Sequence, residues 1–151
     1  MAKELNTNIE IDAPANVVWE ALTDFGRYNQ WNPFIRSIRG EAEQGEQLEI
    51  LIQPPGGKGM TFRPVIRDLN PNRELSWIGK LLLPGILDSE HQFQIEPLGE
   101  HRTRLINREV FFGLLVPLLW RDLDTKIRQG FEEMNRALKK RAEDPTYHTI
   151  C

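Results

Sequence analysis

The fold is decided at residues 116–143, which read VPLLWRDLDTKIRQGFEEMNRALKKRAE. Apolar side chains recur there at spacings of three or four residues, which places them on one face of a helix. They are Leu119, Leu123, Ile127, Phe131, Met134 and Leu138. Basic residues follow at 139–141, where positive charge complements the helix dipole. The stretch therefore predicts one long helix whose apolar face must be covered.

The strands that precede this helix are expected to supply the surface. Residues 35–113 contain short apolar and alternating segments between turn-forming residues, with one strand over 60–71. Another strand is predicted at residues 3–12. Strands joined by short turns pair antiparallel, because parallel pairing needs a long crossover. We therefore predict an α+β fold in which a curved antiparallel sheet of about six to seven strands covers the long helix.

Two short helices are predicted between the first strand and Pro33. Asp12 suits the N-cap of the first helix, and Pro14 suits its first turn. The second helix is expected over residues 24–28. Pro33 ends this region, because proline cannot continue a helix.

Size and composition indicate one globular domain. The chain has 151 residues, of which 40% are hydrophobic and 27% are charged. Its formal net charge of −3 gives no strong attraction to nucleic acid, so no nucleic-acid partner is expected. The domain is predicted to span residues 1–144, followed by a flexible tail at 145–151.

Metal-binding, cofactor-binding and membrane-spanning roles find no support in the sequence. Cys151 is the single cysteine, which excludes an internal disulfide and a site built from several cysteines. The three histidines show no metal-ligand spacing, so we expect no metal and no cofactor. The N-terminus has no long apolar stretch, and the run LLVPLLW at 114–120 is too short to cross a bilayer. We expect a soluble, cytoplasmic protein without an integral membrane segment.

Alternation along three strands predicts which side chains point into the protein. The inward sets are Leu75, Trp77, Gly79 and Leu81, then Leu87, Ser89, His91, Phe93 and Ile95, then Leu105, Asn107, Glu109 and Phe111. A buried charge is costly unless it is paired or hydrated. The polar members therefore indicate either room for water or a ligand, or an ordinary core in which His91 and Glu109 satisfy each other.

Nearly the whole chain, from Asn6 to Glu143, resembles the START-like superfamily, also called SRPBCC or Bet v 1-like. The closest likeness is to its polyketide cyclase/dehydrase-like branch. The resemblance lies in IEIDAPANVVWEALTDFGRYNQWNPFI (9–35), LNPNRELSWIGKL (69–81), HQFQIEPLGEHRTRLINREVFFGLL (91–115) and GFEEMNRALKKRAE (130–143). It implies a helix-grip fold, in which a curved sheet wraps the long C-terminal helix and leaves a deep apolar cavity.

The resemblance also suggests roles for the aromatic stretch DFGRYNQWNPFIRSIRG, residues 24–40. Trp31 and Phe34 would line the cavity or its entrance, unless their rings fill the base of the short-helix pair. Tyr28 is expected at the rim or on the surface. Gly130 costs the long helix about 1 kcal/mol relative to alanine. A small residue there would widen the cavity or allow close packing against the sheet, or it reflects simple drift of the helix sequence.

The leading functional hypothesis is binding of a small, mostly hydrophobic molecule, such as a lipid, a steroid or a polyketide-like compound. The candidate ligand-binding residues are Trp31, Phe34, Phe62, Trp77, His91, Phe93, Asn107, Glu109, Phe111, Phe131 and Met134.

Two alternatives remain open. The first is a cyclase- or dehydratase-like enzyme in which buried His91 and Glu109 are the candidate catalytic acid and base. The second is a protein-interaction or co-chaperone-like module, for which FFGLLVPLLW at 111–120 would supply an exposed apolar patch. The chain is expected to be a monomer or a weak homodimer.

Overall fold

The structure, a computed structural model, describes residues 2–80 and 85–146 of the chain. Its elements are β1 (Ala2–Ile11), α1 (Ala15–Thr23), the 3₁₀ helix η1 (Phe25–Gln30), β2 (Ile35–Arg39), β3 (Glu49–Ile52), β4 (Met60–Phe62), β5 (Val65–Asn70), β6 (Glu74–Lys80), β7 (Asp88–Gly99), β8 (Arg102–Phe112), α2 (Val116–Asp122), the π-helical turn η2 (Leu123–Ile127) and α3 (Arg128–Glu143). The predicted α+β class is confirmed. Leu81, most of the expected tail and Cys151 lie outside the described residues.

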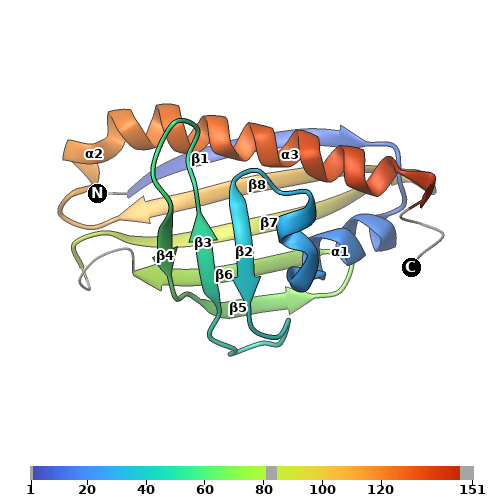
Figure 1. The fold of residues 1–151 in the computed structure, drawn as a ribbon, viewed down its shortest axis with the longest axis horizontal. Helices are drawn as coiled ribbons and strands as arrows, with labels where there is room; N and C mark the ends of the chain where they lie inside the picture. Colours follow the sequence, from blue (N-terminus) through green and yellow to red (C-terminus); the bar gives the residue numbers. More distant parts are fainter. Residues whose placement is uncertain (1, 81–84, 147–151) are drawn as a thin grey trace.

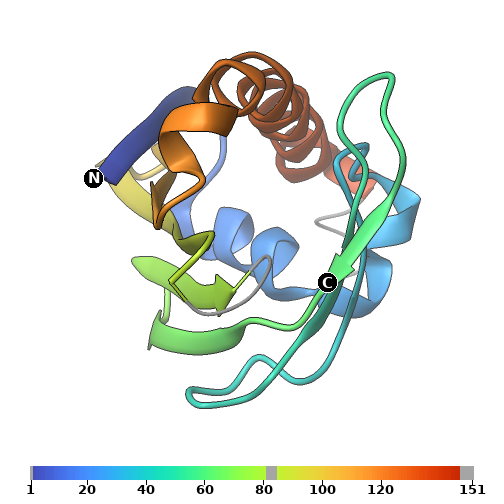
Figure 2. The ribbon, with the colours of Figure 1, turned by 90° about the vertical axis from the view of Figure 1, so that its left-hand side faces the viewer.

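The strands form two antiparallel sheets. The larger sheet has the strand order β1-β8-β7-β6-β5, and the smaller one has the order β2-β3-β4. Figure 1 shows α2 and α3 running along the large sheet, with the small sheet crossing in front. α3 packs mainly against β1, and in Figure 2 the small sheet closes a side of the interior that the helix leaves open. This arrangement is the predicted helix-grip fold.

The single strand predicted at residues 60–71 is wrong, because the chain changes sheets within it. β4 ends at Phe62 and pairs with β3, whereas β5 begins at Val65 and pairs with β6. Pro64 lies between them and has no N–H with which to continue a ladder. Its carbonyl oxygen accepts the N–H of Leu48 at 2.8 Å, which ties the two sheets together. The described strands therefore form one sheet of five and one of three, not a single sheet of six to seven.

The start of α1 and the end of α3 are joined. Pro14, not Asp12, occupies the N-cap of α1, and no side chain caps this helix. The backbone N–H of Asp12 instead donates to the Glu143 carboxylate at 2.7 Å. Lys139 Nζ donates to the carbonyl oxygen of Glu10 at 3.0 Å. These bonds hold the C-terminal end of α3 to the end of β1.

Tyr28 is fully buried, so its predicted position at the rim or surface is wrong. Its hydroxyl donates to the carbonyl oxygen of Leu22. Its ring packs edge-on against Phe25 and Trp31, at centroid distances of 5.8 and 5.0 Å. Tyr28 and Trp31 therefore fill the base of the pair formed by α1 and η1.

The long helix has the predicted extent but is not uniform. Its middle, residues 123–127, is a π-helical turn in which the N–H of Arg128 bonds to the carbonyl oxygen of Leu123. A bond of this span accommodates one more residue than an α-helical turn and often marks a functional site. The turn separates α2, which precedes it, from α3, which packs on β1.

The start of α2 carries exposed apolar side chains. Leu114 and Leu118 are each 79% exposed, within the predicted apolar patch at 111–120. Within residues 2–80 and 85–146, no helix combines the length and apolar character that crossing a membrane requires.

Candidate functional site

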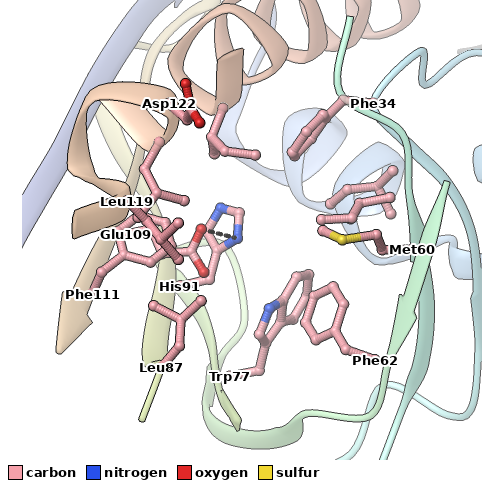
Figure 3. A pocket seen from close by; sticks show the side chains of 14 residues that line it. Phe34, Met60, Phe62, Trp77, Leu87, His91, Glu109, Phe111, Leu119 and Asp122 are labelled. Carbon is pink, nitrogen blue, oxygen red and sulfur yellow. Dashed lines mark ion pairs between the residues drawn. The ribbon is translucent and has the colours of Figure 1, made fainter. Parts of the chain in front are cut away.

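An apolar cavity of about 280 Å³, partly open to solvent, lies between the helix and the two sheets. Figure 3 shows its side chains converging from the small sheet on one side and from the helix and large sheet on the other. It is lined by Phe34, Ile35, Ile52, Met60, Phe62, Trp77, Leu87, His91, Glu109, Phe111, Leu119, Asp122, Leu123 and Ile127.

Several candidate residues from the sequence line this cavity. They are Phe34, Phe62, Trp77, His91, Glu109 and Phe111. The strand residues among them lie where alternation predicts, because every second side chain of β6, β7 and β8 points to the concave face.

The other candidates do not line the cavity. Phe93 and Phe131 stack against His91, at centroid distances of 4.4 and 4.8 Å, and form a layer behind the wall. Met134 and Asn107 are also buried outside the wall, and Trp31 packs against Tyr28. Alternation identified the buried face correctly, but it does not tell which part of that face the helix covers.

Further lining residues were not among the candidates. Leu119, Leu123 and Ile127 belong to the apolar face that the periodicity of residues 116–143 identified, so a signal for them existed. Asp122 carried no such signal, because an exposed acidic residue on a helix ordinarily faces water. Leu87 was predicted to point inward, whereas Ile35, Ile52 and Met60 line the cavity without a predicted role.

The polar groups of the cavity form one row across the large sheet. Trp77 on β6 is the register partner of His91 on β7, which is the register partner of Glu109 on β8. Such cross-strand partners point to the same face of a sheet. The indole Nε1 of Trp77 is buried without a hydrogen-bond partner. In Figure 3 this nitrogen lies on the edge of the ring turned towards Leu87 and Glu109.

His91 and Glu109 have pKa values shifted towards each other's usual range. Burial lowers the pKa of His91 to about 4, although a hydrogen bond with Asn107 opposes this shift. Burial raises the pKa of Glu109 to about 7, against a hydrogen bond from Ser89. His91 Nδ1 and Glu109 Oε1 are 3.9 Å apart. Burial therefore favours the uncharged forms of both groups, the neutral imidazole and the protonated carboxyl.

Gly130 allows one wall of the cavity to approach the helix. A Cβ atom at this position would lie 2.3 Å from Cδ1 of Phe34, which is far inside van der Waals contact. The Phe34 ring also packs edge-on against Phe131, with ring centroids 5.7 Å apart. This contact supports the packing explanation for the glycine over simple sequence drift.

The part of the chain that the structure describes contains no group of three histidine, cysteine, aspartate or glutamate residues able to hold a metal ion. The cavity wall offers an imidazole, two carboxyl groups, an indole N–H and apolar side chains.

The two sheets, the gripping helix and the apolar cavity define a helix-grip protein, and the family match together with the solved structures supports the START-like superfamily that the sequence resemblance implied. The family of polyketide cyclase/dehydrase and lipid transport proteins matches residues 3–143, and the chain belongs to this family. No curated protein matches the chain in sequence.

Solved structures share the fold at low sequence identity. The Zhui aromatase/cyclase from Streptomyces sp. R1128 is 19% identical, with a TM-score of 0.79 over 95% of this chain and 94% of that one. A START superfamily protein from Mycobacterium smegmatis is 22% identical, with a TM-score of 0.75 over 93% and 97% of the two chains. A norcoclaurine synthase mutant from Thalictrum flavum, bound to a transition-state analogue, is 12% identical, with a TM-score of 0.73 over 94% of each chain. At these identities the likeness is one of fold.

Proposed function

We propose that the protein binds a small, mostly hydrophobic molecule in the cavity between the long helix and the sheets. The observation that carries this proposal is an apolar cavity with an unpaired indole N–H in its wall. A buried donor without a partner is costly, and a ligand oxygen would satisfy it. The row of Trp77, His91 and Glu109 would then orient the polar end of the ligand.

The size of the cavity supports a compact ligand. Its volume of about 280 Å³ lies near the lower end of the range of about 300–1,000 Å³ for small-molecule sites. Burial of apolar ligand surface supplies about 25 cal/mol per Å², before the costs of ordering are deducted. These magnitudes favour a ring compound of polyketide-like size over a long-chain lipid.

A titration with polyketide, steroid and lipid probes, followed by tryptophan fluorescence, tests the proposal. Because Trp77 lines the cavity, a bound ring compound is expected to quench or shift its emission. The Trp77→Phe variant is the matched control, because it keeps an aromatic ring and three other tryptophans but loses the reporter. Absence of any response across the panel, together with absence of binding by calorimetry, would contradict the proposal.

A second candidate function is a cyclase- or dehydratase-like activity on a carbonyl-rich compound. The raised pKa of Glu109 favours it, because acid–base catalysis works best when the pKa lies near the working pH. Glu109→Gln and His91→Gln are each expected to lower turnover by about 10²–10⁴-fold while the ligand still binds. Unchanged turnover in both variants would exclude these residues from the reaction.

A further inference from the structure

A closed chain of hydrogen bonds lies behind His91. Its Nε2 is 2.6 Å from Oδ1 of Asn107, and Nδ2 of Asn107 donates to Oδ1 of Asn135 at 3.0 Å. Nδ2 of Asn135 donates to Oγ1 of Thr7 at 2.9 Å. The Thr7 hydroxyl donates to the backbone carbonyl oxygen of Asn107 at 2.8 Å. All four residues are buried, and they come from β7, β8, α3 and β1.

The hydrogen bond from Thr7 to the backbone carbonyl oxygen of Asn107 sets the direction of the other hydrogen bonds in the series. A backbone carbonyl oxygen only accepts, so the Thr7 hydroxyl must donate its single proton to it. The Thr7 oxygen can then only accept the bond from Asn135. Asn135 therefore turns its NH₂ group towards Thr7 and its oxygen towards Asn107. Asn107 in turn presents its NH₂ group to Asn135 and its oxygen to His91. Reversal of any one amide would place two donors or two acceptors face to face.

The direction of the chain fixes the tautomer of His91. Because Nε2 faces the oxygen of Asn107, it must carry the proton of the neutral ring. Nδ1 then carries a lone pair and acts as a hydrogen-bond acceptor. It lies on the side of Glu109, whose nearest oxygen is 3.9 Å away and beyond hydrogen-bond distance. Stacking against Phe93 and Phe131 holds the ring in this orientation.

We propose that Thr7 and Asn135 are positioning residues that hold His91 Nδ1 as an acceptor in the cavity wall, so that the site prefers ligands carrying a hydroxyl group. This inference rests on the proposed ligand-binding function and specifies the ligand. A phenol or enol would donate to Nδ1, while an oxygen elsewhere on the same molecule would accept from the indole N–H of Trp77. Neither Thr7 nor Asn135 lines the cavity, so both act through Asn107 and His91.

The tautomer is measured first, without any ligand. The ¹⁵N spectrum of the His91 ring at neutral pH is expected to show a protonated Nε2 and an unprotonated Nδ1. Thr7→Val keeps the shape of the side chain but removes the hydroxyl, so both amides are free to reverse and the protonated Nδ1 form is expected to appear. Thr7→Ser retains the hydroxyl and is expected to retain the wild-type spectrum. A wild-type spectrum in Thr7→Val, or a protonated Nδ1 in the wild type, would overturn the inference.

Ligand selection is then measured with 2-naphthol, 2-methoxynaphthalene and naphthalene as matched probes. The wild type and Thr7→Ser are expected to bind 2-naphthol about fivefold more tightly than the methyl ether, as befits one added hydrogen bond. In Thr7→Val this ratio is expected to fall towards one, while naphthalene affinity stays unchanged. The methyl ether is also larger than 2-naphthol, but this difference in ligand size is the same for every variant. Comparing the affinity ratio of the two ligands between variants therefore removes it.

The outcomes separate this inference from the function on which it rests. Equal binding of 2-naphthol and its ether to the wild type would leave the ligand-binding function standing and overturn the preference for hydroxyl groups. Failure of all three probes to bind would contradict both. A ratio that falls equally in Thr7→Ser and Thr7→Val would mark Thr7 as merely structural and would also overturn the inference.

Discussion

Gly130 is the residue at which a single methyl group would press directly on the cavity wall. Gly130→Ala places a Cβ atom 2.3 Å from Cδ1 of Phe34, so the ring must move towards the cavity that it lines. Overpacking costs roughly 1–3 kcal/mol, and the better helix propensity of alanine returns about 1 kcal/mol. We expect a net loss of about 1 kcal/mol in the free energy of unfolding by urea titration, together with weaker ligand binding.

The double variant Gly130→Ala, Phe34→Leu is the control for this prediction. Leucine has no planar ring at the point of contact, so the stability lost in Gly130→Ala is expected to return in part. Greater stability of Gly130→Ala than of the wild type would show that the Phe34 ring moves aside without cost, contrary to the packing described.

The two buried titratable groups of the cavity have opposite effects on stability. Glu109 has a folded pKa raised from 4.5 to about 7, so its contribution to stability is present below pH 4.5 and is lost as the pH rises to 7. His91 has a folded pKa lowered from 6.5 to about 4, so its contribution is present above pH 6.5 and is lost as the pH falls to 4. The two slopes oppose each other between pH 4.5 and 6.5.

Glu109→Gln is therefore expected to gain stability relative to the wild type as the pH rises from 4.5 to 7. The gain amounts to a few kcal/mol, because one pKa unit corresponds to about 1.4 kcal/mol. Urea unfolding of both proteins across pH 4–8 measures the difference between their free energies of unfolding. Titratable groups that the two proteins share contribute equally to both and cancel in this difference. A difference that does not change with pH would mean that the carboxyl group has an ordinary pKa in the folded protein.

Among the elements, the strands whose side chains alternate were the most predictable. In β7 and β8 every second residue is apolar or becomes buried, and this pattern placed His91 and Glu109 on the interior face. The break at Pro64 was not predicted, because proline at a strand edge and proline between two sheets look alike in sequence. The π turn was also missed, because apolar spacings of three or four residues do not reveal which carbonyl an N–H will reach.

For the candidate site, the sequence predicted which side chains are buried but not which of them line the cavity. Alternation separates buried from exposed positions, and the resemblance supplied the idea of a cavity. Neither distinguishes Trp77, which lines the cavity, from Phe93, which lies behind it, because that depends on where the helix and the His91 ring pack. Asn107 was expected to face a ligand, but its side chain is already bonded to His91 and Asn135.

The π turn sets how α2 faces the cavity. Deletion of Thr125 is expected to turn η2 into an α-helical turn and to rotate α2 by about 100° relative to α3. Leu119 and Leu123 would then leave the cavity wall, so we expect ligand affinity to fall at least about tenfold. Circular dichroism should still report a folded, helical protein, because α3 keeps its packing on β1. Thr125→Ala, which preserves the length of the turn, is the control and should bind as the wild type does.

At the scale of the whole molecule, the cavity links ligand binding to stability. A ligand at 100 times its Kd adds about 2.7 kcal/mol to the free energy of unfolding. For a domain of this size the expected rise in Tm is about 5–10 °C. Calorimetric scans at increasing ligand concentration measure it, and a Tm that does not depend on concentration would contradict binding to the folded state.

A variant with a filled cavity shows whether the rise in Tm comes from this site. Ile52 lies on β3 and lines the cavity, so Ile52→Trp is expected to occupy part of the space that a ligand would take. The ligand is then expected to leave the Tm unchanged. A rise equal to that of the wild type would place the binding site elsewhere on the molecule.

The bonds from Asp12 and Glu10 to the last turn of α3 fasten the C-terminal end of the long helix to β1. Glu143 and Lys139 make these bonds, and the other end of the long helix is held by Arg128, which donates to the carbonyl oxygen of Asn6, and by the N–H groups of Leu114 and Leu115, which donate to the carbonyl oxygens of Gly85 and Ile86. The long helix is therefore fastened near both of its ends.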